Sequence, residues 1–537
     1  DFQNLVVLRP GVERVPGGGF LSISSNGIRP ENNNFIFDGT DNNDPYYGTT
    51  VINAEGVQGT PGTVLPIDAI QEFNALENPS AEYGWKPGAI VNLGIKSGTN
   101  EVHGSAYYFA RRSSLDARNF FNPPPAPQKG LSQDQFGASL GGPIRKNKTF
   151  IFGNYEGVRG NVSNSNQASV PAAVGLPSAP IPAPGDPDER CLLSGTGNCA
   201  NSLVNAVRNL SMRPGFTIPA GTCGGAPVTR TASGQLSLNP LSANLIGCGS
   251  FTGNGAFPGL YPLNDGTNPS GVKQINTGFP NTNRMDAFIV KVDHHFNDQH
   301  ALTGRYFFGD SIQKEQDFTV LRPEWGSQSD LRAQVVGANY TWVPSATWVN
   351  ELKFGYNRFW QKITTVDSSL NPLATYGINT GVTTSENFGM PTIVISGFDQ
   401  LGGNSGWPLF TIPNETYQFV DNVSYSRGKH TFRFGAEFRF GKTDNLRNRR
   451  GKGRIRFLGE ATSGLGRDST PLEDFLAGNP NRGDVFVGSS RRNVSIKSFG
   501  WFFQDDWRIT PRVTINAGIR YDLNSPIKER NNQLGNF

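Results

Sequence analysis

The residues best suited to covalent chemistry are four cysteines that fall in one part of the sequence: Cys191, Cys199, Cys223 and Cys248. An even number of clustered, widely spaced cysteines favours two disulfide bonds formed outside the cytoplasm. Four free thiols are the alternative. A zinc site is disfavoured, because no two of these cysteines are separated by only two residues and no histidine lies nearby.

A second group of polar residues is rich in side-chain oxygen atoms. Its members are Asn32, Asn33, Asn34, Asp38, Asp41, Asn42, Asn43 and Asp44. Calcium binding of the EF-hand type needs acids at alternate positions before a glycine, and this spacing does not match that pattern. We therefore predict no metal here and interpret the group as turn-forming residues in contact with water. Tyr46 and Tyr47 follow directly and form either a substrate-facing platform or an internal packing contact.

The catalytic motifs H-E-x-x-H and G-x-G-x-x-G are absent from the sequence. His294 and His295 are adjacent in a predicted strand, so they point to opposite faces and cannot share a metal ion. Asp505 and Asp506 are separated in the same way. We therefore predict that the protein is not an enzyme and uses no cofactor.

The elements that must position the remaining polar residues are strands. Apolar and polar residues alternate strictly in 430–440 and 513–523, and the same period of two recurs in 336–342, 351–357 and 498–504. One face of each strand is therefore apolar and the other is in contact with water. The second face carries charged residues that we predict to line a hydrophilic interior: Glu351, Lys353, Arg433, Glu437, Arg439, Arg520 and Asp522.

Three features favour a membrane β-barrel over a soluble β-sandwich. Alternating runs of about ten residues, the length that a tilted strand needs to cross a bilayer, are common, whereas soluble strands centre near five or six residues. Aromatic residues such as Trp342, Trp348, Trp501 and Trp507 lie near predicted strand ends, as in the girdles at lipid headgroups. The connections also alternate between short and long, as periplasmic turns and extracellular loops do.

We predict eleven barrel strands from the pattern: 102–111, 133–144, 148–158, 284–296, 299–309, 332–343, 347–360, 416–426, 429–441, 494–507 and 511–523. The longest connection, 159–283, contains all four cysteines. It is rich in Pro, Gly, Ser and Asn, and 377–407 is the second candidate loop for ligand contact. The net charge of +4 gives no reason to expect binding to nucleic acid.

Residues 88–109, GAIVNLGIKSGTNEVHGSAYYF, form a predicted strand, a polar turn and a second strand. A short helix is predicted upstream, over 66–73, because Pro66 suits its start and Asp68 and Glu72 suit its positive end. Together with AIQEFNALENPSAEYG (69–84) and LDARNFF (115–121), residues 88–109 resemble the plug-to-barrel junction of TonB-dependent outer-membrane receptors, and most closely the Oar-like group.

This resemblance implies a mainly β protein with an α+β plug domain over 1–100 inside a partial antiparallel transmembrane barrel over 101–537. About eleven of twenty-two strands would be present, and we expect a fragment whose TonB-contacting segment would precede Asp1. The implied location is the bacterial outer membrane, in contact with its lipid. The implied function is active transport of an oligosaccharide, peptide or metal chelate, with an extracellular ligand and the TonB–ExbB–ExbD complex as partners.

Candidates for the substrate path are polar residues of the plug together with the charged residues predicted inside the barrel. The plug candidates are Asp41, Asn42, Asp44, Tyr46 and Tyr47. The competing hypothesis is a secreted or surface adhesion protein built from soluble β-sandwiches. The two differ in one observable feature, because the aromatic faces pack against a second sheet in a sandwich and form an exposed band in a barrel.

Overall fold

In this computed structural model, the described part of the chain consists of residues 6–14, 23–54, 62–76, 79–118, 124, 128–163, 167–171, 203, 206, 210, 239–246, 259–262, 273–315, 319–404, 409–462 and 469–534. The cysteines and the proposed disulfides lie outside these residues. None of the helices within them has the length and apolar character of a membrane-spanning helix.

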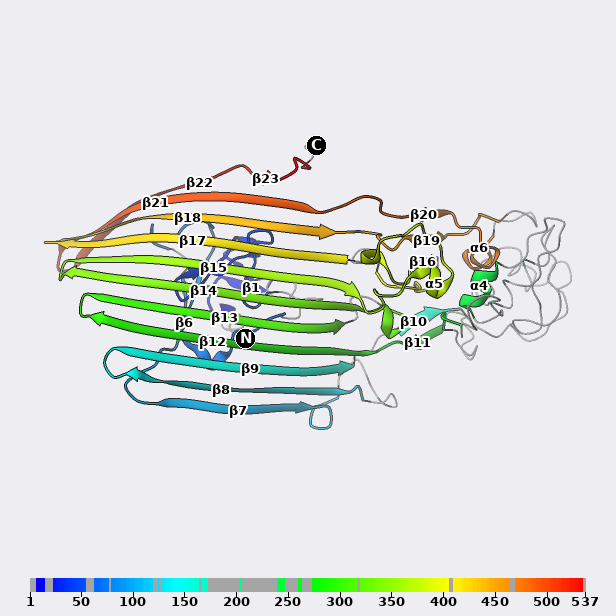
Figure 1. The fold of residues 1–537 in the computed structure, drawn as a ribbon, viewed down its shortest axis with the longest axis horizontal. Coiled ribbons are helices and arrows are strands. Elements are labelled where there is room, and N and C mark those ends of the chain that lie inside the picture. The colour runs from blue at the N-terminus through cyan, green and yellow to red at the C-terminus, as the bar shows by residue number, and fades with distance from the viewer. Residues whose placement is uncertain are drawn as a thin grey trace.

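A large antiparallel sheet dominates the structure (Figure 1). Its long strands are β7 (His103–Arg112), β8 (Leu131–Arg145), β9 (Thr149–Ser163), β12 (Pro280–Asn297), β13 (His300–Glu315), β14 (Ser327–Ser345), β15 (Trp348–Thr365), β17 (Leu409–Arg427), β18 (His430–Arg447), β21 (Arg492–Thr510) and β22 (Val513–Asn524). Each pairs with its neighbour in this order, and the two-residue strand β23 (Lys528–Glu529) also pairs with β21. The prediction of about eleven strands therefore missed a short twelfth strand.

The observed strands overlap all eleven predicted ranges, but most extend further. β9 continues to Ser163 rather than ending at residue 158, and β12 begins at Pro280 rather than at residue 284. The longer extensions lie at the end of the sheet that carries the long connections, whereas the short turns lie at the opposite end (Figure 1). Polar side chains occupy both faces of the extensions, so a period-two pattern ends before the backbone pairing does.

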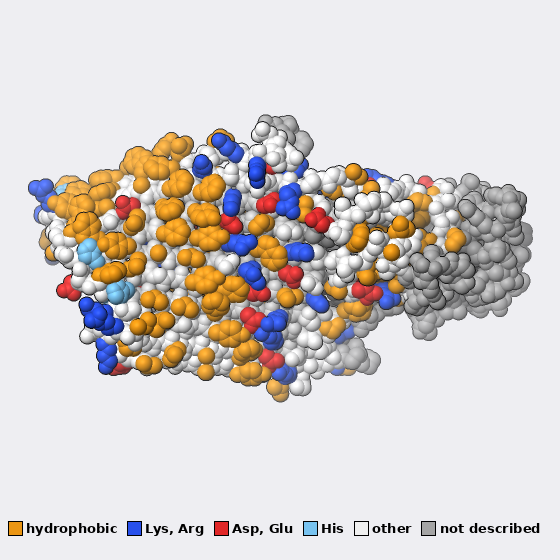
Figure 2. Space-filling model, in the orientation of Figure 1, with side chains coloured by type: hydrophobic (Ala, Val, Ile, Leu, Met, Phe, Trp, Pro, Cys, Tyr) orange, Lys and Arg blue, Asp and Glu red, His pale blue; other side chains and the backbone are white. Residues whose placement is uncertain are grey.

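The two faces of the large sheet differ in character. Phe434, Phe438, Trp501 and Ile515 point outward and are 36, 39, 42 and 45% exposed, with no second sheet over them in the described residues. The sandwich hypothesis is therefore wrong. Figure 2 shows hydrophobic side chains spread over this outer face, with few charged ones among them, between the short turns and a belt of charged side chains nearer the long connections.

The N-terminal residues form a small separate sheet in the order β4-β3-β6-β5. Its strands are β3 (Asn34–Phe37), β4 (Thr40–Asp41), β5 (Ile70–Leu76) and β6 (Ile90–Ile95), with the small pair β1 (Val12–Arg14) and β2 (Ile23–Ser25) and the 3-10 turns η1 (Pro30–Asn32) and η3 (Ile67–Ala69) beside it. Asp38 and Gly39 form the turn between β3 and β4, where they adopt φ values of +49° and +86°.

The predicted helix over 66–73 is wrong. Only Ile67–Ala69 is helical, and the chain then enters β5, which pairs with β6 over most of its length. Local helix-start signals at Pro66 and Asp68 are real, but backbone pairing with β6 supplies more hydrogen bonds than one further helical turn. Tertiary pairing overrides a weak local preference here.

The large sheet curves around the N-terminal domain. Ser105 of β7 donates a hydrogen bond to Asp68, and Arg520 of β22 donates one to the Glu82 carbonyl, at 2.5 and 3.0 Å. These strands lie at opposite ends of the eleven-strand path, which would be about 50 Å wide if flat at roughly 4.8 Å per strand. A domain of this size can contact both edges only if the sheet wraps around it.

The long connections converge on a hydrophobic cluster of their own, which includes Trp325, Tyr376, Ile393, Phe457 and Phe475. Their elements are β10 (Gln167–Val170), β11 (Lys273–Asn276), α4 (Pro240–Leu245), η5 (Pro323–Trp325), α5 (Pro372–Tyr376), η6 (Ser385–Asn387), β16 (Thr392–Ile395), β19 (Arg454–Phe457), α6 (Pro471–Ala477) and β20 (Arg482–Asp484). Strands β16, β19 and β20 form a three-stranded sheet. The connections therefore form a folded cap beyond the large sheet (Figure 1).

Candidate functional site

The turn between β3 and β4 places a carboxylate against two cations of the large sheet. Asp38 Oδ2 lies 3.1 Å from Lys291 Nζ on β12 and 3.4 Å from Arg305 Nη1 on β13. The Arg305 side chain is fully buried and that of Lys291 is 9% exposed. Lys291 also donates a hydrogen bond to the Ile95 carbonyl at 3.0 Å. A positive φ at Asp38 thus presents the carboxylate to the sheet interior.

A second contact involves Asp41, whose Oδ1 lies 3.0 Å from Arg439 Nη1 on β18. Arg439 also pairs with Glu437, and Glu437 Oε2 lies 2.9 Å from Arg520 on β22. Arg520 in turn lies 2.9 Å from Asp522. Both Asp41 and Arg439 are almost fully buried. Charges of opposite sign therefore alternate from the N-terminal domain across two strands of the sheet interior.

Amide side chains complete the polar contact around Asp41. Asn357 Nδ2 donates to the Asp41 carbonyl at 3.0 Å and to its Oδ2 at 3.1 Å, and the Asp41 N–H donates to Gln418 Oε1 at 2.9 Å. Asn414 Nδ2 donates to Asp44 Oδ2 at 2.6 Å. Burial raises the pKa of Asp44, although hydrogen bonds from Tyr47, Asn414 and Tyr46 oppose that rise.

The oxygen-rich group over 32–44 is a buried network, so the prediction of water-contacting turns is wrong for most of it. Asn33, Asn34, Asn42 and Asn43 are at most 2% exposed. Asn43 Nδ2, for example, donates to Asn34 Oδ1 and to Asp41 Oδ1 at 2.8 and 2.6 Å. These amides satisfy one another inside the domain because the strand pairing folds the segment back on itself.

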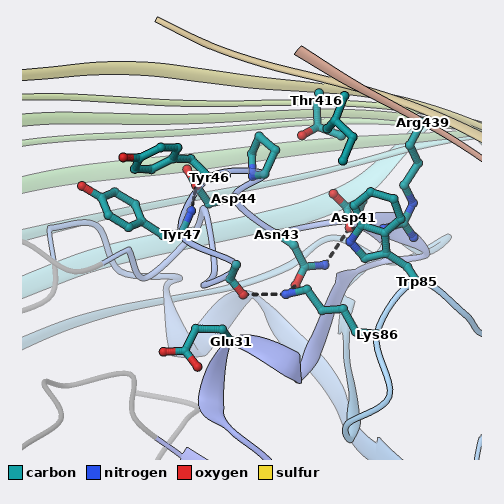
Figure 3. A pocket seen from close by; sticks show the side chains of 14 residues that line it. Glu31, Asp41, Asn43, Asp44, Tyr46, Tyr47, Trp85, Lys86, Thr416 and Arg439 are labelled. Atoms are coloured by element: carbon teal, nitrogen blue, oxygen red, sulfur yellow. Dashed lines mark hydrogen bonds and ion pairs between the residues drawn. The ribbon is translucent and has the colours of Figure 1, made fainter. Parts of the chain in front are cut away.

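A cavity of about 300 Å³ lies between this segment and the sheet interior (Figure 3). Tyr46 and Tyr47 lie on one side of it, and Trp85, Lys86 and Arg439 lie on the other. The Arg439 guanidinium carbon lies 4.8 Å from the centre of the Trp85 ring, a favourable cation–π geometry. Trp85 adopts φ +75°, a strained conformation that its surroundings must hold.

Lys86 lines this cavity and is fixed by three hydrogen bonds. Its Nζ donates to the Asn33 carbonyl and to Asn43 Oδ1, both at 3.0 Å, and to the Gly48 carbonyl. Burial lowers the pKa of Lys86 to about 8, although the Asp41 carboxylate opposes this. These three hydrogen bonds go to neutral oxygen atoms, and the buried ammonium loses its proton more readily than an exposed lysine does.

This pKa predicts a pH dependence of stability. The unfolded chain keeps the Lys86 proton up to the ordinary pKa of 10.5, whereas the folded protein loses it near 8. Between these values the unfolded state binds more protons, so this group makes the domain more stable as pH rises. Urea midpoints at pH 7.5 and 9.5 should show that rise in the wild type and lose it in Lys86→Met. Lys96→Met, at a half-exposed ion pair with Asp68, is the control that should keep it. An unchanged pH profile in Lys86→Met would contradict the assignment.

The structure brings most predicted path residues together. Asp41, Asp44, Tyr46, Tyr47 and Arg439 line the cavity. Glu437, Arg520 and Asp522 extend from Arg439 through ion pairs. The remaining candidates, Asn42, Glu351, Lys353 and Arg433, do not line it.

These four candidates make other contacts. Asn42 is fully buried and accepts a hydrogen bond from the Ile52 N–H at 2.9 Å. Lys353 pairs with Glu351 at 3.1 Å on β15. Arg433 lies 3.9 Å from Glu82 and 3.4 Å from Asp506. Arg433 therefore connects the N-terminal domain with the sheet, outside the cavity.

Sequence reasoning missed several residues of this interface: Trp85, Lys86, Lys291, Arg305, Asn357, Asn414 and Gln418. Lys291 carried a usable signal, since it is a cation in an otherwise apolar stretch of β12, and it occupies an inward position of the alternation. The amides carried no such signal. Their importance comes only from the opposing Asp41 and Asp44. Within the described ranges, no group of three or more His, Cys, Asp or Glu side chains is placed to hold a metal ion.

Comparison with known proteins gives three findings. Residues 94–537 match the family described as "Outer membrane beta barrel domain". The TonB-dependent transporter Oar of Myxococcus xanthus is 31% identical over 161 residues, which are 29% of this chain and 14% of that protein. The crystal structure of the outer membrane transporter YddB from Escherichia coli aligns with a TM-score of 0.54 at 12% identity and covers 99% of this chain and 55% of that one. The chain thus spans about half the length of this structural neighbour and less of the curated relative.

Proposed function

Because this chain belongs to the outer membrane beta barrel domain family, we propose that it is part of a TonB-dependent active transporter. The protein is located in the bacterial outer membrane. Residues 1–100 would act as the plug, and the strands of 101–537 would belong to a 22-stranded barrel around it. The TonB–ExbB–ExbD complex would supply the energy, as it does for TonB-dependent transporters, and the chain would do no catalysis.

The observation that carries this proposal is the ion-paired contact of Asp38 and Asp41 with the inner face of the sheet. A buried charge is stable only while its partner stays in place or water replaces that partner. An interface of this kind holds the domain firmly in the resting state. When the domain is pulled, water can also hydrate the charged groups of this interface. Exposing an apolar interface of the same size to water would cost much more free energy.

The interface is uneven, and this indicates where a path would open. Apolar side chains dominate the contact with strands β9 to β15 and include Phe152, Ile289, Phe307, Val335 and Phe359. Polar side chains dominate the contact with β17 to β22. We infer that a pulled plug separates first from the polar side, next to the cavity, where Asp41, Asp44, Tyr46, Tyr47 and Arg439 would meet the substrate. Asn42, Glu351, Lys353, Arg433, Glu437, Arg520 and Asp522 would support that path.

The test uses cells that carry the complete gene, with and without a functional TonB. Uptake is measured for labelled ferric siderophores, cobalamin, oligosaccharides and peptides. We expect one of these classes to enter only when TonB is present. Uptake that is equal in both strains would overturn the proposal, and cells without the gene provide the background.

We also propose that Cys191, Cys199, Cys223 and Cys248 form two disulfide bonds in the longest extracellular loop. Each bond would stabilise the loop by about 2–4 kcal/mol by restricting its unfolded state. Peptide mapping of the protein from outer membranes, without reduction, should give two pairs of cross-linked cysteine peptides. Four alkylated thiols under the same conditions would disprove the pairing.

A further inference from the structure

The segment that runs from the end of β18 to the start of β21 carries an unusual excess of positive charge. Residues 442–493 contain eleven Lys and Arg against six Asp and Glu, a net charge of +5, whereas the whole chain has +4. Six of the ten residues over 447–456 are Lys or Arg, and none is acidic. Two of the six acids, Glu473 and Asp474, face the buried side of α6. The positive charge is therefore concentrated around β19 and β20.

Pairing between β19 and β20 places three arginines and one aspartate next to one another on the small sheet. Arg454 lies directly opposite Asp484, and Arg456 lies directly opposite Arg482. Residues two apart on a strand share a face, so all four point to the same side of the small sheet. The intervening Ile455 points to the other side and packs on the hydrophobic cluster of the cap. The apolar contact behind the sheet thus fixes the orientation of the arginines.

Four guanidinium groups converge on the single Asp484 carboxylate. The distances are 2.8 Å from Arg482, 3.0 Å from Arg454, 3.3 Å from Arg456 and 3.6 Å from Arg450. One negative charge against four positive charges leaves a net charge of +3. The pKa of Asp484 falls to about 2 because hydrogen bonds from Arg454 and Arg482 outweigh the effect of desolvation. The carboxylate is therefore ionised at any physiological pH.

This arrangement is costly for a structural cluster. Like charges directly opposite each other in a sheet are destabilising, and Arg456 and Arg482 form such a pair. Arg450 reaches the cluster from a strained backbone with φ +60°. Within the described part of the chain, the buried Arg456 Nε has no hydrogen-bond partner. One carboxylate cannot accept hydrogen bonds from every N–H group of four guanidinium groups, so a further oxyanion would stabilise this arrangement.

We propose that Arg450, Arg454, Arg456 and Arg482, which surround Asp484, form an extracellular binding site for a phosphate or sulfate group of an anionic ligand. Guanidinium groups bind such oxyanions through paired N–H donors, and several converging arginines favour multiply charged groups. Arg450 and Arg482 are 40% and 59% exposed, so the site is open to solvent. This site is independent of the proposed path at Asp41 and extends the function to ligand capture.

Two sources could supply the group, a soluble phosphorylated ligand or the phosphates of outer-leaflet glycolipid. The complete protein, purified in detergent, is therefore titrated with inorganic tripolyphosphate, and lipid A that stays bound is measured by native mass spectrometry. We expect Arg456→Gln/Arg482→Gln to weaken binding at least about tenfold, roughly 1.4 kcal/mol. Tripolyphosphate binding supports a soluble source, and lipid A retention alone supports the glycolipid.

Two further variants separate binding from fold. Arg449→Gln/Arg512→Gln removes the same charge at exposed positions outside the cluster and should bind as the wild type does. Asp484→Asn raises the net charge of the cluster, so it should bind the anion several-fold more tightly. The proposal fails if the wild type binds neither probe, if the control loses as much affinity as the double variant, or if Asp484→Asn binds more weakly. None of these results depends on TonB.

Discussion

Arg439→Ala should release the segment that joins the N-terminal domain to β18. Removal of the guanidinium leaves Asp41 and Glu437 as buried carboxylates without their shared cation, and it also removes the cation–π contact with Trp85. Breaking a buried ion pair from one side typically costs about 3–5 kcal/mol. The measurement is hydrogen–deuterium exchange of the peptide over 34–44 in the complete protein, and this peptide should lose most of its protection.

The matched control removes an arginine from an exposed ion pair on the same sheet. Arg332 and Asp310 lie 2.8 Å apart, but their side chains are 48% and 36% exposed. Arg332→Ala should therefore cost at most about 1 kcal/mol and leave the exchange of 34–44 unchanged. If both variants behave alike, Arg439 does not hold the domain, and the polar contact cannot be the resting-state attachment that the proposed function requires.

The faces of the large sheet could be predicted from the sequence because its alternation has a single physical cause. A strand with lipid on one side and a polar interior on the other must alternate with period two, so Phe438 and Glu437 could be assigned to opposite faces without a structure. The assignment of Arg439 and Arg520 to the interior followed in the same way. The alternation involves only neighbouring residues, so a single sequence is enough to detect it.

The contacts of these residues could not be predicted, because they join positions that lie far apart in the chain. The partners Asp41 and Arg439 are separated by 398 residues, and the hydrogen-bonded pair Asp41 and Gln418 by 377. Nothing in the local pattern states which acid meets which base. The buried amide network had a related difficulty, since Asn and Asp favour turns in isolation. These side chains are buried only because β3 pairs with β4 and β6.

Phe438→Arg should prevent stable assembly in the outer membrane. Phe438 is directly opposite Phe419 and Phe499 on the outer face and is 39% exposed. Lys442, which pairs with Glu415, is the next charged side chain on the same face of this strand. Four residues at about 3.4 Å each place Phe438 roughly 14 Å along the strand from Lys442. A strand tilt of about 40° turns this into roughly 11 Å of depth, close to the middle of an apolar band about 25 Å tall.

An arginine at that depth on the lipid-facing side typically costs about 2–4 kcal/mol. The measurement is the amount of heat-modifiable, correctly folded protein in outer-membrane fractions. Thr431→Arg is the control, because Thr431 lies on the inner face of the same strand beside Asp506, where a cation gains a partner and contacts no lipid. Loss of Phe438→Arg with normal levels of Thr431→Arg is the result that an outward hydrophobic band requires. Equal assembly of the two variants would mean that the aromatic face does not contact lipid. The assignment of the outer and inner faces of the sheet would then be wrong.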